Sequence, residues 1–83
     1  MTYRDFGKAL EKEMMKRFGE KLRKLRQKYG LSYRQLAAEL DSSFSHLSNI
    51  EGGTKYPSPD LILRIADYFE VTADQLMRDE LEV

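Results

Sequence analysis

The chain has 83 residues, which is room for one small domain. Hydrophobic residues make up 41% of it and charged residues 34%, a balance typical of a folded globular protein rather than a disordered chain. The sequence has no cysteine and a single histidine, so we expect no disulfide, no metal site and no cofactor. No apolar run is long enough for a membrane span, and residues 1–12 do not resemble a signal peptide. A cytoplasmic protein is expected.

The charges are unevenly distributed along the chain, although the formal net charge is zero. Residues 1–34 contain 11 Lys and Arg against 4 Asp and Glu, a net charge of +7, whereas residues 35–83 contain 3 against 10, a net charge of −7. Such asymmetry indicates a basic binding face or a partner surface of opposite charge. A solvated basic helix would give the same pattern, so charge alone does not decide between these interpretations.

Apolar residues recur at helical spacing along most of the chain, which predicts an all-α fold of five or six helices. Residues 1–17 form a helical extension with an apolar stripe at Tyr3, Phe6, Leu10 and Met14. The stripe continues at Phe18, Leu22, Leu25 and Tyr29. Gly19 leaves open whether this region is one long helix or two, and Gly30 marks its end.

Capping signals delimit the later helices. Ser32 and Gln35 form a capping box at the start of the second helix of the domain, and Thr72 and Gln75 form another near the C-terminus. Ser58, followed by proline and an acid, begins a further helix. The acidic tail, residues 78–83, is expected to fray.

Two short helices are predicted on either side of a polar break at Asp41-Ser42-Ser43: the first runs to about Leu40, and the second carries Phe44, Leu47 and Ile50. Ala37 is small where the first helix must pass close to the second, and leucine and isoleucine residues lie on the facing sides. This is the pattern of a helix-turn-helix, in which the second helix enters a DNA major groove. The recognition helix is predicted at Ser43–Glu51.

Residues 18–77 resemble the Cro/phage-repressor (Xre) family of helix-turn-helix transcriptional regulators. The resemblance rests on Arg26 before Gly30-Leu31, Leu36-Ala37, Ile50-Glu51, Gly53, Pro57, Ile65-Ala66 and Val71. It implies a five-helix domain that binds operator DNA, usually as a dimer, and regulates transcription. We therefore expect a phage-repressor-like helix-turn-helix DNA-binding domain at residues 18–83, with an additional N-terminal helix at 1–17.

The resemblance also implies roles for individual residues. The family pairs an arginine of its first helix with a glutamate that ends the recognition helix, and these positions are Arg26 and Glu51 here. Base contacts are expected at Ser43, Phe44, Ser45, His46, Ser48 and Asn49. Among them, Asn49 suits a bidentate contact with adenine, whereas Ser43 can instead cap the helix. Phosphate contacts are expected at Ser32, Tyr33, Arg34, Thr54, Lys55 and Tyr56.

The chain departs from the family at three positions. Tyr33 and Phe44 stand where the family commonly has two glutamines that brace each other. Phe44 can pack against a thymine methyl group, with Tyr33 stacked on it, or both aromatic residues can mark a surface that binds protein. Asp41 replaces the usual turn glycine, which aspartate tolerates because it visits left-handed conformations.

We expect a sequence-specific double-stranded DNA-binding regulator, a repressor that binds a palindromic operator as a homodimer. The helical extension, residues 1–17, either forms the dimer contact or packs on its own domain. The alternative is a protein-interaction module, an antitoxin or anti-repressor, that binds a toxin or another regulator through the same face. Catalysis is not expected, because no Ser/His/Asp arrangement and no Gly-rich phosphate loop is recognisable.

Overall fold

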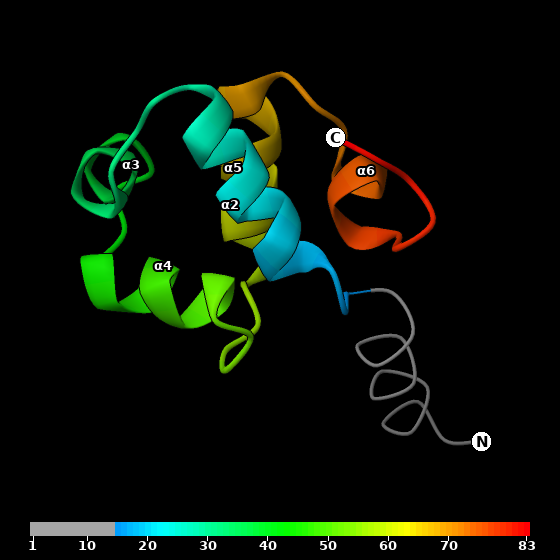
Figure 1. The fold of residues 1–83 in the computed structure, drawn as a ribbon, viewed down its shortest axis with the longest axis horizontal. Helices are drawn as coiled ribbons and strands as arrows, with labels where there is room; N and C mark the ends of the chain where they lie inside the picture. The colour runs from blue at the N-terminus through cyan, green and yellow to red at the C-terminus, as the bar shows by residue number, and fades with distance from the viewer. Residues whose placement is uncertain (1–14) are drawn as a thin grey trace.

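The described part of the fold consists of helices joined by short loops, with a C-terminal tail (Figure 1). The computed structural model describes residues 15–83, which contain α2 (Phe18–Lys28), α3 (Tyr33–Glu39), α4 (Phe44–Glu51), α5 (Pro59–Phe69) and α6 (Ala73–Met77). These residues form no strand, which confirms the prediction of an all-α fold with a five-helix domain. The additional helix predicted for residues 1–17 lies outside the described residues, apart from a turn at 15–17 that leads into α2.

Local capping signals set three of the helix starts. Ser32 Oγ accepts a hydrogen bond from the Gln35 N–H at 3.1 Å, and Gln35 Oε1 accepts one from the Ser32 N–H at 2.8 Å. The same pair of bonds joins Thr72 and Gln75 at the start of α6. Ser58 caps α5 through its side chain. These starts were predictable because each cap joins residues only three positions apart.

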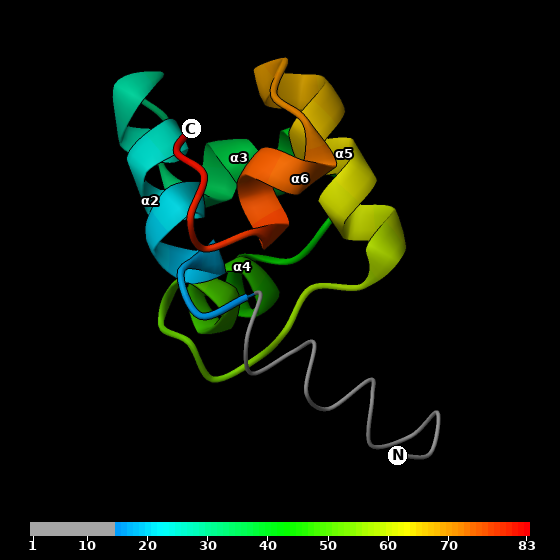
Figure 2. The same ribbon diagram turned by 90° about the vertical axis from the view of Figure 1, so that its right-hand side faces the viewer.

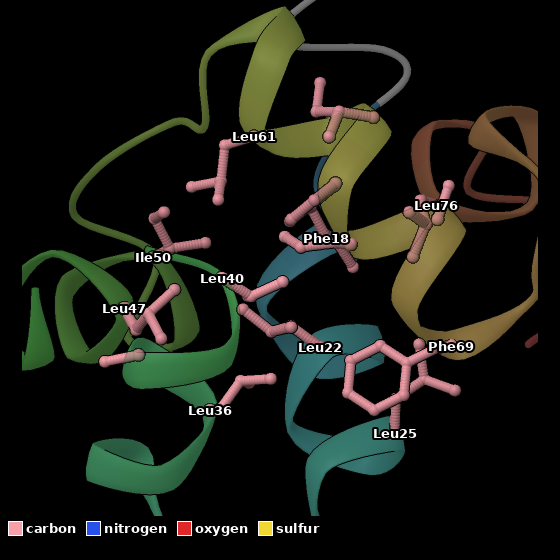
Figure 3. Packing of buried hydrophobic residues seen from close by; sticks show 14 of the residues in the cluster. Phe18, Leu22, Leu25, Leu36, Leu40, Leu47, Ile50, Leu61, Phe69 and Leu76 are labelled. Carbon is pink, nitrogen blue, oxygen red and sulfur yellow. The ribbon is translucent and has the colours of Figure 1, made fainter. Parts of the chain in front are cut away.

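A single apolar core lies between the helices, and Figure 3 shows side chains from all five converging on it. The labelled core residues are at most 5% exposed: Phe18, Leu22, Leu25, Leu36, Leu40, Leu47, Ile50, Leu61, Phe69 and Leu76. Burial of each such side chain contributes about 1.5–3 kcal/mol, so this core is the main stabilising feature of the domain. Tyr29 differs from the prediction, because it is 50% exposed; its ring meets that of Phe69 edge to face, with centroids 5.1 Å apart.

Gly19 lies in the first turn of α2, so it does not interrupt that helix. A Cβ atom at this position would lie 2.5 Å from the carbonyl oxygen of Ile50 and 2.7 Å from that of Glu51. Real side chains do not tolerate such distances. Glycine is therefore needed here because α2 crosses the C-terminal end of α4 at very short range.

The C-terminal tail, residues 78–83, runs beside α2 (Figure 2), so the expectation that it frays is wrong. The Asp79 carboxylate accepts hydrogen bonds from the N–H groups of Arg17 at 3.0 Å and Lys16 at 3.3 Å. The bond to Arg17 satisfies the N-cap amide of α2, which has no cap from the side chain of its own N-cap residue. The Arg17 guanidinium donates to both carboxylate oxygens of Glu82, at 2.8 and 2.9 Å.

Lys21 joins α2 to the end of α6. Its side chain is buried, and Nζ donates to the carbonyl oxygens of Gln75 at 2.6 Å and Arg78 at 2.5 Å. A cation is favourable there because these carbonyl groups form the negative end of the α6 dipole. Burial lowers the pKa of Lys21, and the nearby Arg17 charge lowers it further. No local pattern in the sequence predicts this contact, because its partners lie 54 and 57 positions away.

Candidate nucleic-acid interface

A helix-turn-helix lies at the end of the molecule opposite α6 (Figure 1). Residues 40–43 connect α3 to α4, and Asp41 adopts the left-handed conformation with a φ of 52°. Aspartate tolerates this conformation, as expected for a residue that stands in place of a turn glycine. Ala37 is buried, and Arg64 Nη1 of α5 donates to the Leu40 carbonyl at 3.0 Å, which satisfies the end of α3.

The predicted base-contacting residues lie on α4 and differ in exposure. Ser43 precedes the helix, and its Oγ accepts a hydrogen bond from the His46 N–H at 3.0 Å, so this oxygen serves as the helix cap. Phe44, Ser45 and Asn49 are exposed. His46 and Ser48 are half-buried. The outer side of α4 therefore presents one aromatic ring, one hydroxyl and one amide to solvent.

Glu51 ends α4 and lies between two arginines of α2. Its fully buried carboxylate accepts a hydrogen bond from Arg26 Nε at 2.8 Å and another from Arg23 Nε at 3.3 Å. Arg26 also donates from Nη1 to the Leu31 carbonyl at 2.8 Å. Hydrogen bonding to Glu51 raises the pKa of Arg26 above its usual value. The structure therefore brings together the predicted pair, Arg26 and Glu51, and adds Arg23 to it.

Sequence reasoning missed Arg23, although a signal was present. Arg23 precedes Arg26 by three positions, so both side chains lie on the same side of α2. Because Arg26 contacts the buried Glu51 carboxylate, an arginine one helical turn earlier is close enough to contact the same carboxylate.

The two aromatic residues that depart from the family pattern contact each other. The rings of Tyr33 and Phe44 meet edge to face, with centroids 5.6 Å apart and planes at 85°. The Arg26 guanidinium lies 4.2 Å from the centre of the Tyr33 ring, and that of Arg34 lies 5.3 Å from the centre of the Phe44 ring. Side-chain contacts thus run from the buried Glu51 through Arg26 and Tyr33 to the start of α4.

The predicted phosphate contacts fall into two groups on either side of α4. Ser32, Tyr33 and Arg34 lie at the start of α3, where the Ser32 hydroxyl already caps the helix. Thr54, Lys55 and Tyr56 are exposed in the loop after α4. The Asn49 carbonyl holds this loop, because it accepts hydrogen bonds from the N–H groups of Thr54 at 2.9 Å and Lys55 at 3.3 Å.

An anchored second helix with an exposed polar side defines a helix-turn-helix domain. The chain belongs to this family: the family model described as "Helix-turn-helix domain" matches residues 17–81. The chain is 38% identical over 63 residues to the HTH-type transcriptional activator BcrR of Enterococcus faecalis, with 76% of this chain and 31% of BcrR covered. It is 31% identical over 64 residues to the HTH-type transcriptional regulator ImmR of Bacillus subtilis (strain 168), with 76% of this chain and 50% of ImmR covered.

The fold is also similar to a solved structure, the restriction-modification controller protein C.AhdI from Aeromonas hydrophila. The TM-score is 0.68 at 30% sequence identity, with 76% of this chain and 96% of that chain covered. These similarities confirm the prediction of a helix-turn-helix domain of the Cro/phage-repressor (Xre) type. The chain spans half or less of the length of the two curated relatives. Within residues 15–83, every helix is too short or too polar to cross a membrane.

Proposed function

We propose that the chain is a sequence-specific double-stranded DNA-binding transcriptional regulator that inserts α4 into the major groove. The observation that supports this most strongly is how α4 is attached. The buried Glu51 fixes its C-terminal end to α2, while Phe44, Ser45 and Asn49 remain exposed. A recognition helix requires both a rigid attachment and an accessible face. Family membership supports the same class, and such a role fits the cytoplasmic location expected from the sequence.

In this proposal the two kinds of DNA contact come from different parts of the surface. Asn49 reads an adenine through its amide, and Phe44 packs against the methyl group of a thymine. Ser45, His46 and Ser48 contribute further base or phosphate contacts along α4. The remaining predicted residues bind backbone phosphates from the two ends of the motif: Ser32, Tyr33, Arg34, Ser43, Thr54, Lys55 and Tyr56.

We further propose that the chain acts as a homodimer on a palindromic operator and represses transcription. A two-fold dimer matches the symmetry of inverted half-sites. Besides residues 1–17, whose first 14 lie outside the described residues, one surface can serve as the dimer contact. Leu63 is 57% exposed beside an apolar hollow of about 220 Å³ between α5 and α6, which is lined by Pro59, Ile62, Ala73 and Met77.

Selection of binding sites from a random duplex pool, read by sequencing, tests the proposal. Two inverted half-sites with centres about 10 bp apart are expected. A single half-site would support DNA binding and contradict the dimer. A variant with Ser45, His46 and Asn49 all changed to alanine keeps the core and the Glu51 ion pairs, so it is the matched negative control. Absence of enrichment by the wild-type chain at low salt would contradict DNA binding.

The second candidate function is binding of a protein partner, a toxin or another regulator, through the same face. The observation in its favour is the exposure of two aromatic side chains, 44% for Phe44 and 51% for Tyr56. Salt dependence separates the two functions. DNA binding weakens steeply with salt, with a slope of about −0.9 per neutralised phosphate, whereas an aromatic protein contact responds far less.

A further inference from the structure

A surface hollow of about 330 Å³ lies where the start of α2, the end of α4 and the loop after α4 meet. These segments lie close together in both ribbon views (Figures 1 and 2). Three cationic residues line the hollow: Lys16 and Arg23 come from the turn before α2 and from α2, and Lys55 comes from the loop after α4. Gly52 and Gly53, which follow α4, line it as well and add no side chain to it.

Two acidic residues also line the hollow, and each has a cationic partner. Glu51 accepts hydrogen bonds from both Arg23 and Arg26, so a single carboxylate faces two guanidinium groups. Glu20 pairs with the Arg17 Nε at 3.0 Å. The hollow therefore keeps an excess of positive charge, supplied by the second arginine at Glu51 and by the two lysines.

The two arginines that contact Glu51 differ in how many of their N–H groups remain accessible to a ligand. Arg26 is 14% exposed, and its guanidinium is occupied by Glu51, by the Leu31 carbonyl and by the Tyr33 ring. Arg23 is 50% exposed, and among the described residues it donates only from Nε, to Glu51. The bond to Glu51 thus leaves the terminal nitrogens of Arg23 unused, and this side chain lines the hollow. Hydrogen bonding to Glu51 and the nearby Tyr33 hydroxyl both raise the pKa of Arg23, so its guanidinium keeps its positive charge.

We propose that this hollow binds a backbone phosphate of duplex DNA, held by Arg23 and Lys55 with Lys16 at its edge. This inference rests on the proposed DNA-binding function and adds Arg23 and Lys16 to the predicted contacts. A guanidinium with two accessible N–H groups matches the oxygens of a phosphate. The site lies beyond the C-terminal end of α4, where the strand that borders the major groove passes the recognition helix.

The position of the site explains why it needs side-chain cations. The C-terminal end of a helix carries the negative end of the helix dipole, which disfavours a phosphate. Main-chain carbonyl groups at the end of α4 cannot attract a phosphate, so the attraction has to come from cationic side chains. In the proposed site, Arg23 and Lys55 supply this missing attraction.

The experiment measures binding of a fluorescent mixed-sequence duplex at several salt concentrations by anisotropy. The slope of log K against log salt counts neutralised phosphates, at about 0.9 for each one. Arg23→Gln and Lys55→Gln are each expected to reduce the magnitude of this slope by up to about 0.9 and to weaken binding to all sequences alike. Arg23→Lys keeps the charge and is expected to retain the wild-type slope.

Lys24→Gln is the matched control. Lys24 is the next residue of the same helix and is 58% exposed, but it lies 3.9 Å from Glu82 of the tail and does not line the hollow. Arg23→Gln leaves Arg26 on Glu51, so the variant is expected to fold, and thermal unfolding checks this. A folded Arg23→Gln with the same slope as Lys24→Gln would overturn the inference. Failure of the wild-type chain to bind any duplex would instead refute the proposed function.

Discussion

Glu51 Oε2 accepts a hydrogen bond from Arg26 Nε at 2.8 Å, across 25 positions of sequence. The bond joins the end of α4 to α2, and the carboxylate is completely buried while the arginine keeps 14% of its side chain exposed. The orientation of the proposed recognition helix therefore depends on a charge pair that water scarcely reaches.

Arg26→Gln is expected to destabilise the domain by about 3 kcal/mol, because the buried Glu51 loses its main partner. Arg23→Gln is expected to cost about 1 kcal/mol or less, since Arg23 is half exposed and Arg26 remains. Urea unfolding followed by circular dichroism measures both. Equal losses for the two variants would show that the division of roles between these arginines is wrong.

Asn49→Ala is expected to relax base preference at one operator position and to cost about 1–3 kcal/mol on the selected site. The reason is loss of the bidentate amide contact with adenine. Binding to the selected site and to its single-base variants measures the change. Asp67→Ala, an exposed substitution on α5, serves as the control and is expected to leave the preference intact. Retention of full preference by Asn49→Ala would exclude this residue from base readout.

Phe44 is expected to make binding sensitive to a single methyl group. Replacing one thymine of the site by uracil removes only that methyl group and is expected to weaken wild-type binding by about 0.8 kcal/mol, or about fourfold. The effect should occur at one position and disappear in Phe44→Ala, which has no ring to contact the methyl. If uracil has the same effect on both proteins, the methyl is not read by Phe44.

Gly19→Ala is expected to destabilise the domain by about 1–3 kcal/mol, because its Cβ would lie 2.5 Å from the Ile50 carbonyl oxygen and force α2 away from α4. Gly52→Ala is the matched control. Its Cβ would lie 3.3 Å from the nearest atom, and Gly52 already has a right-handed helical conformation. The control is expected to change stability by less than about 1 kcal/mol. Thermal or urea unfolding of the two variants and the wild-type chain measures both changes in stability.

Glu82 is expected to make the tail contact sensitive to acid. Hydrogen bonding to Arg17 lowers the pKa of Glu82 below its usual value of 4.5. Between this lowered pKa and about pH 4.5, the unfolded chain therefore binds more protons than the folded chain. The stabilisation that Glu82 gives the folded state is present above about pH 4.5 and is lost as the pH falls through the lowered pKa. At pH 7 the wild-type chain should have a higher Tm than Glu82→Gln. This difference in Tm should shrink towards zero as the pH falls below 4.5. Glu80→Gln, which removes a tail carboxylate that lies 3.8 Å from Arg78 rather than on Arg17, is the matched control.

The features that the sequence predicted well depend on neighbouring residues. The cap formed by Ser32 and the left-handed conformation of Gly30 involve positions one to three apart, so they can be read from local spacing. The apolar stripes of α2 and α5 are equally local. The resemblance to a known family supplied what local reasoning could not, namely that Arg26 and Glu51 meet across the fold.

The features that the sequence did not predict are contacts between distant segments. The buried position of Lys21 and the capping of α2 by Asp79 depend on where α6 ends relative to α2, which no local pattern records. Gly19 was ambiguous for the same reason, since its role depends on how α2 crosses α4. The hollow lined by Arg23 and Lys55 likewise exists only once two distant stretches of the chain, residues 15–23 and 50–57, have come together.

The cap of α2 has a consequence for the order in which this domain matures on the ribosome. Asp79 follows every described helix in the chain, yet it supplies the acceptors for the amide groups of Arg17, the N-cap residue of α2, and of Lys16 before it, 62 and 63 positions earlier. During synthesis, α2 emerges from the exit tunnel long before its cap has been made. A nascent chain halted before Asp79 would present an uncapped α2, so the finished domain should assemble late, in one cooperative step, after translation of its last residues.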